Sequence, residues 1–226
     1  YASDGGEGFA TNAKLIIPTG YTLTPPAGYK WVAQDGKQVL EAITYVAQID
    51  DVKYETLAEA VEAAVGETTI TLLADASGDG VIAPENSSFT LDLGGHTYTV
   101  DGTLVGSTGT ETNGFQLLKG STITIKNGTI TTPNVTGAKI LIQNYSNLTL
   151  DNVDLVGADV TQYVLSNNNG STKLESGTTI TAQDDNVAFD VYYWPGNGYE
   201  SVTVEIASDD VAITGRVEYA SDGGEG

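Results

Sequence analysis

Residues 121–131 read STITIKNGTIT, which is a short alternating strand, a polar Asn-Gly turn and a second short strand. The same pattern recurs along the chain, at 89–100 (FTLDLGGHTYTV), 147–156 (NLTLDNVDLV), 171–181 (STKLESGTTIT) and 201–214 (SVTVEIASDDVAIT). Alternation places one side of each strand in a core, while Asn, Gly and Asp tolerate the backbone angles of tight corners.

A third apolar strand lies between these stretches, at 114–118, 139–143, 163–166 and 187–191. Successive third strands begin 25, 24 and 24 residues apart. Three short strands in a constant period indicate stacked structural repeats. The sequence therefore predicts an all-β fold, a short parallel β-helix of about five to six coils.

One helix is predicted, over residues 56–65 (TLAEAVEAAV). Its apolar residues fall on a single face, namely Leu57, Ala60, Val61, Ala64 and Val65. Thr56 and Glu59 have the spacing of a capping box, and Gly66 stands at the expected stop. The first coil strand follows at 69–73, so we expect this apolar face to cap the N-terminal end of the stack, whose bare strand edges would otherwise promote aggregation.

Composition excludes several functions. The chain of 226 residues has 30 acidic against 9 basic residues, a net charge of −21, so no nucleic-acid partner is expected. It has no Cys, which excludes disulfides and Cys-ligated metals. No run of apolar residues approaches the length of a membrane span, so no membrane insertion of this segment is expected.

The octapeptide YASDGGEG occurs at residues 1–8 and again at 219–226, a period of 218 residues. Together with the absence of Met, this recurrence predicts one period of a longer tandem array. The predicted organisation is a linker or junction at 1–13, a small β unit connecting repeats at 14–50, the capping helix and β-helix at 51–218, and the start of the next repeat at 219–226.

Residues 45–64 (YVAQIDDVKYETLAEAVEAA), followed by TITLLAD, LDLGGHT and IKNGTI, resemble the pectate-lyase-like β-helix modules of large bacterial cell-surface proteins. The resemblance covers residues 45–218. It implies a right-handed β-helix and an extracellular or cell-surface location.

Enzymes with this fold cleave acidic polysaccharides, with paired carboxylates in the hydrolases and an arginine base beside calcium in the lyases. The hydrolase motifs are an Asp pair, Gly-His-Gly and Arg-x-Lys. The chain has the pair Asp184-Asp185, but Gly95-His96 is followed by Thr97, and Arg216, its only Arg, is followed by Val217-Glu218, so the other two motifs are incomplete. We therefore expect no catalysis, and keep polysaccharide lyase or glycoside hydrolase as the last alternative.

Two sets of residues are candidate sites. Asp75 and Asp79 in DASGDG (75–80), and Asp222 and Glu225 in the terminal SDGGEG, are weak candidates for calcium, and no other cofactor is expected. Four aromatic residues crowd a Pro-Gly turn in YYWPGNGY (192–199), where they are candidates for contact with a glycan or a neighbouring repeat: Tyr192, Tyr193, Trp194 and Tyr199.

The function predicted from sequence is that of a structural repeat module in a long extracellular bacterial fibre or cell-surface protein. Its expected partners are copies of itself, in tandem or head to tail. The alternative is a carbohydrate-binding adhesin module that uses the aromatic residues at 192–199 to bind glycans.

Overall fold

The computed structural model describes residues 14–193, 198 and 201–220. The chain divides into two units, residues 1–44 and 45–226. Both are mostly β, and the described residues hold one α-helix. The predicted all-β class with a single helix and parallel sheets is therefore confirmed.

The described part of the first unit, residues 14–44, is called the N-terminal unit below. It is a three-stranded antiparallel sheet in the order β1 (Ile16–Pro18), β3 (Lys37–Ala42), β2 (Tyr29–Gln34). Asp35 and Gly36 join β2 to β3, both with positive φ, as a two-residue hairpin turn requires. Its buried apolar residues are Ile17, Val39 and Leu40, so its core is small.

The second unit begins with a hairpin, β4 (Ala47–Ile49) and β5 (Val52–Tyr54), which turns at Asp50. β4 pairs antiparallel with β6 (Thr68–Leu72), the first strand of the main sheet. The boundary between units therefore follows Thr44 rather than Asp50, because the last residues of the predicted 14–50 unit pair within the second unit.

The helix α1 (Leu57–Ala63) is shorter than the predicted 56–65. The capping box is present, since the Thr56 side chain accepts from the Glu59 N–H and the Glu59 side chain accepts from the Thr56 N–H, each at 3.1 Å. Ala64 is already extended and ends the helix. This ending removes Val65 from the apolar face, and Val65 is 85% exposed.

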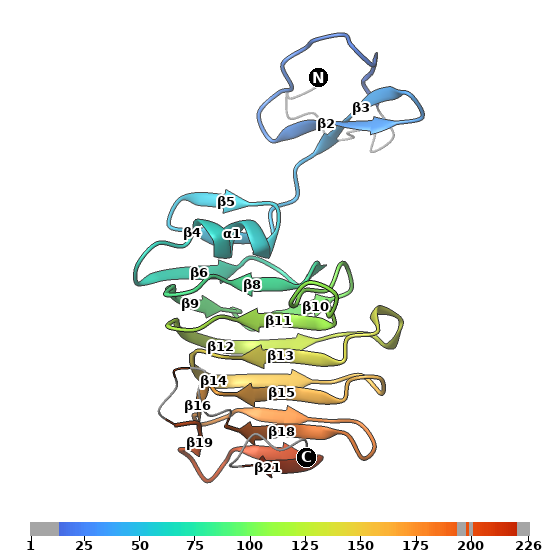
Figure 1. Ribbon diagram of the computed structural model, residues 1–226. Coiled ribbons are helices and arrows are strands. Elements are labelled where there is room, and N and C mark those ends of the chain that lie inside the picture. The colour runs from blue at the N-terminus through green and yellow to red at the C-terminus, as the bar shows by residue number, and fades with distance from the viewer. Residues whose placement is uncertain (1–13, 194–197, 199–200, 221–226) are drawn as a thin grey trace. The chain divides into compact units, whose positions relative to one another are not determined.

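The remaining strands of the second unit fall into six successive levels, each hydrogen-bonded in parallel to the next (Figure 1). The levels are, in chain order, β6, β7 (Ala76–Gly78) and β8 (Val81–Ala83); β9 (Ser88–Asp92), β10 (Thr97–Val100) and β11 (Asn113–Leu117); β12 (Thr122–Thr131) and β13 (Ile140–Asn144); β14 (Asn147–Val156) and β15 (Tyr163–Asn168); β16 (Ser171–Leu174), β17 (Thr179–Thr181) and β18 (Val187–Tyr192); β19 (Thr203–Ile206), β20 (Ala212–Thr214) and β21 (Arg216–Ala220). We call the set β19, β20 and β21 the last level.

Because of the register of these strands, apolar residues of successive levels pair with one another and form columns. One column consists of Ile70, Leu91, Ile125, Leu150, Leu174 and Ile206. A second consists of Val81, Phe115, Ile142, Leu165, Phe189 and Val217. These columns form the core of the unit, and α1 adds Leu57, Ala60 and Val61 to the same buried cluster. Ala64 packs against the cluster while partly exposed.

The corners between strands use the residues that the sequence indicates. Asn127 and Asn152, at equivalent places in β12 and β14, both have positive φ. Gly128 follows at a point where an added Cβ would lie 2.4 Å from the His96 carbonyl oxygen, so only Gly fits there.

Candidate functional site

Asp75 and Asp79, the two calcium candidates among the described residues, each accept a hydrogen bond from a backbone N–H group. An Asp75 carboxylate oxygen accepts from the Thr97 N–H at 3.0 Å, and an Asp79 carboxylate oxygen accepts from the Thr103 N–H at 2.6 Å. The residues between and after these two acids form strands β7 and β8. Across the described residues no group of three His, Cys, Asp or Glu side chains could hold a metal ion. Asp222 and Glu225 lie outside the described residues.

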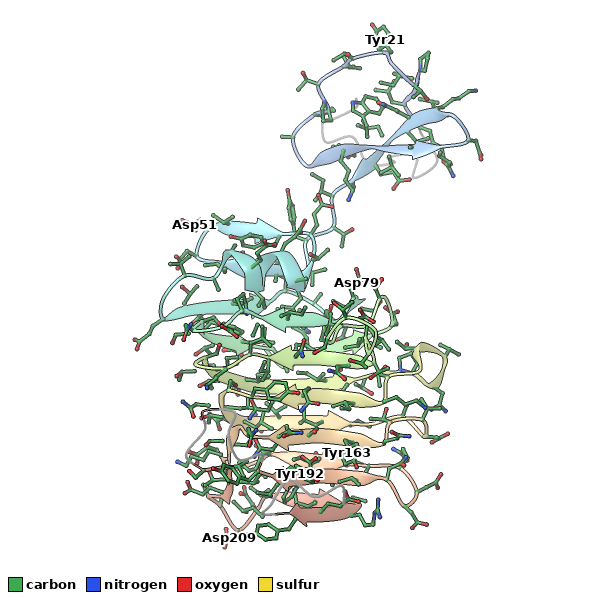
Figure 2. All side chains as sticks on the ribbon, in the orientation of Figure 1. Tyr21, Asp51, Asp79, Tyr163, Tyr192 and Asp209 are labelled. Atoms are coloured by element: carbon green, nitrogen blue, oxygen red, sulfur yellow. The ribbon has the colours of Figure 1, made fainter. Side chains whose placement is uncertain are left out.

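The predicted aromatic patch begins at the end of the fifth level. Tyr192 is the last residue of β18, Tyr193 follows it, and both are half-buried, while Trp194 and Tyr199 lie outside the described residues. Figure 2 shows Tyr192 and Tyr163 on the sheet that contains β15 and β18.

The segment after β18 is an insertion relative to the two levels before it. From β14 to β16 the paired residues Asn147 and Ser171 are 24 positions apart, whereas from β16 to β19 the paired residues Ser171 and Thr203 are 32 apart. Gly198 within this insertion accepts a hydrogen bond through its carbonyl oxygen from Lys119 Nζ at 3.1 Å. Gly198 therefore contacts the corner that follows β11, three levels earlier in the stack.

A cleft of about 200 Å³ lies at this row of corners, and we call it the corner cleft. Its lining comes from the corners of successive levels and from the insertion: Lys119, Gly120, Tyr145, Ser146, Asn147, Asn169, Ser171 and Ser201. Hydroxyl and amide groups dominate this lining, and none of the described carboxylates contributes to it, although the chain as a whole is strongly acidic.

A column of mostly buried polar residues, not predicted from the sequence, runs along the sheet that contains β11, β13, β15, β18 and β21. Gln116, Gln143, Ser166, Asp190 and Glu218 are register partners in successive strands. Gln143 Nε2 donates to Ser166 Oγ at 3.2 Å, and Ser166 Oγ donates to the Asp190 carboxylate at 3.2 Å. Four of the five residues are at most 6% exposed, and Glu218 is partly buried.

Electrostatics in this column centre on Asp190. Burial raises the pKa of Asp190 to about 6, against the opposing effect of hydrogen bonds from the Asn167 N–H and from Ser166, and the nearby Glu218 charge raises it further. Burial, with added effects of the carboxylates, also raises the pKa values of Tyr145 and Tyr163 above their ordinary range. Glu218 is not alone, since it forms an ion pair with Arg216 at 3.0 Å.

The last level is the least covered part of the second unit. In the first apolar column every residue from Ile70 to Leu174 is at most 1% exposed, whereas Ile206 is 53% exposed. In the second column Phe189 is 6% exposed and its partner Val217 is 51% exposed. Tyr219 on β21 is 77% exposed. The opposite end differs, because α1 and the β4–β5 hairpin pack on the first level.

Comparison with known proteins finds no matching family model, curated protein or solved structure. Among the described residues no helix has the length and apolar character needed to cross a membrane. The geometry of the last level and of the corner cleft must therefore carry the functional argument.

Proposed function

We propose that the second unit is a right-handed parallel β-helix, and that the chain is a non-catalytic structural repeat module of a long extracellular or cell-surface fibre. Three observations support this proposal. The levels follow chain order in parallel register, one end of the stack is capped, and the octapeptide YASDGGEG recurs with a period of 218 residues. The right-handed coil and the cell-surface location are proposed from the resemblance seen in the sequence of residues 45–218.

The observation that carries the proposal is the uncovered last level. Its residues Ile206 and Val217 belong to columns that are buried at every earlier level, and these two columns are half exposed only here. Among the described strands, β19, β20 and β21 also have a partner on one side only. Such an edge is a template for further pairing. A second copy that continues the stack would bury the columns and satisfy the edge.

The free energies of burial and association indicate how copies would stay together. Burying the exposed parts of Ile206, Val217 and Tyr219 contributes about 3–5 kcal/mol from this side of the contact, and burial of the partner's apolar surface adds to it. Bringing two separate molecules together costs about 4–15 kcal/mol. Separate chains should therefore associate weakly, whereas copies joined in one polypeptide, at an effective concentration in the millimolar range, remain stacked.

Hydrogen exchange of the single chain tests this proposal. Amides of β19 and β21 should exchange more slowly at millimolar than at micromolar protein concentration, because association covers the last level. Amides of the short helix Asn134–Thr136, whose Val135 is 94% exposed, serve as an internal control and should not change. Exchange in β19 and β21 that is independent of concentration would rule out stacking through the last level.

The second candidate function is carbohydrate binding at the corner cleft. The specific observation in its favour is an insertion with aromatic residues beside a cleft lined by hydroxyl and amide groups. Binding sites concentrate in loops that a rigid scaffold holds. A glycan array with the wild-type chain and the Tyr193→Ala variant tests this function. Binding that Tyr193→Ala abolishes supports it, and equal binding by both proteins places any glycan site elsewhere.

A further inference from the structure

We propose that the N-terminal unit of one copy, residues 14–44, covers the last level of another copy. This inference rests on the proposed function and names the segment that forms the contact. The competing segment is the capped end itself, the β4–β5 hairpin with α1, which would meet the last level if the second units stacked directly on each other.

Charge is the first argument. The N-terminal unit has three Lys against two acidic residues, and with Asp4 and Glu7 counted the first 44 residues have a net charge of −1, whereas residues 45–226 have 6 basic and 26 acidic residues, a net charge of −20. The last level and its turns hold four acidic residues, Glu205, Asp209, Asp210 and Glu218. Its one basic residue, Arg216, is already paired with Glu218. A partner with little net negative charge therefore suits this surface.

The competing segment has the wrong charge. Residues 45–67, which include the hairpin and α1, have six acidic residues and one Lys, a net charge of −5. Stacking this segment on the last level would bring like charges within the screening length of about 8 Å at physiological ionic strength. Like-charge juxtaposition opposes association. The charges thus favour the N-terminal unit over the capped end of another copy.

Apolar surface is the second argument. The N-terminal unit buries only three large apolar side chains, yet it exposes Ile16 (48%), Tyr21 (58%) and Leu23 (43%). The last level exposes a comparable set in Ile206, Val217 and Tyr219. Contact between the two surfaces removes both sets from water, which the hydrophobic effect favours.

Strand edges complete the match. Within the described part of the chain, β1 and β2 at the ends of the N-terminal sheet each have one neighbouring strand, and so does each last-level strand. Addition of a strand across such edges is a common mode of recognition, since backbone groups of both sides become paired. The N-terminal unit therefore matches the last level in three respects: its low net charge, its exposed apolar side chains and the unpaired backbone groups at its sheet edges.

Disulfide cross-linking tests this inference, and the chain suits it because it contains no native Cys. One population carries Tyr219→Cys in the last level. A second, ¹⁵N-labelled population carries Tyr21→Cys or Leu23→Cys in the N-terminal unit, Val52→Cys on β5 for the competing segment, or Val135→Cys as an exposed control. Full-length chains are mixed at millimolar concentration, oxidised, and the labelled–unlabelled heterodimers are measured by mass spectrometry.

We expect Tyr21→Cys or Leu23→Cys to give several-fold more heterodimer than Val135→Cys. Lys37→Glu added to that population should reduce the yield several-fold, whereas Lys139→Glu, an exposed Lys of the second unit, should not. If Val52→Cys gives the heterodimer instead, the inference is wrong while end-to-end stacking stands. If no population exceeds the Val135→Cys control, both the inference and the proposed stacking are wrong.

Discussion

Truncation of Leu57 to Ala tests whether α1 caps the first level. Leu57 is fully buried, in the same cluster as Ile70 of β6 and Val81 of β8. Leu→Ala at such a site removes apolar contacts and leaves a cavity, which costs about 2–5 kcal/mol. For a domain of this size each kcal/mol lowers Tm by about 2–4 °C, so we expect a decrease in Tm of about 6–12 °C for a mid-range loss of about 3 kcal/mol.

The matched control lies in the same predicted apolar stripe. Val65 is 85% exposed, and Val65→Ala should change stability by no more than about 0.5 kcal/mol. Thermal unfolding followed by circular dichroism measures both variants at one protein concentration. Equal Tm values for the Leu57→Ala variant and the wild type would refute the capping role of α1, and a large decrease for Val65→Ala would refute the observed end of the helix.

Two further predictions concern buried polar groups. Because the folded protein raises the pKa of Asp190 to about 6, it binds more protons than the unfolded chain between about pH 4 and pH 6, so this group lowers stability as pH rises through that window. Asp190→Asn should therefore stabilise the protein by up to about 3 kcal/mol above pH 6 and not near pH 4. Urea unfolding at several pH values measures this difference. A gain in stability that does not depend on pH would contradict the prediction. Asn144 is fully buried, donates to Asn167 Oδ1 at 2.9 Å and accepts from the Ser146 N–H at 2.9 Å. Asn144→Ala should therefore lower the free energy of unfolding in urea by about 2–4 kcal/mol, whereas Asn147→Ala, at an exposed position, should lower it by less than about 0.5 kcal/mol. Equal losses would contradict the role of Asn144.

Much of the fold was predictable because periodic patterns record which side chains face the core. The stretch 121–131 became β12, and the third strands at 139–143 and 187–191 became β13 and β18 within a residue or two. Strand boundaries near residue 45 were less predictable, because pairing of β4 with β6 depends on a partner that lies beyond α1 in the sequence. The end of α1 was missed by two residues, since Ala64 and Val65 continue the apolar spacing although the backbone has already turned.

The candidate sites were predictable only in part. The aromatic residues Tyr192 and Tyr193 were identified from their clustering at 192–199. The corner cleft depends on Lys119, three levels away, and no local pattern indicates its contact with Gly198. Asp75 and Asp79 drew attention as acids in a Gly-rich segment, whereas their partners are backbone N–H groups of the next level. The buried polar column was detectable in principle, since Gln143, Ser166 and Asp190 occupy the same position in successive third strands.

The most direct test of the central claim, end-to-end stacking through the last level, is sedimentation equilibrium of the single chain from micromolar to millimolar concentration. The weight-average mass of the wild type should rise above 23.5 kDa with concentration, and the Ile206→Asp variant, altered at a side chain that is already 53% exposed, should stay near that mass. A wild-type mass that remains at 23.5 kDa up to millimolar concentration would contradict the account.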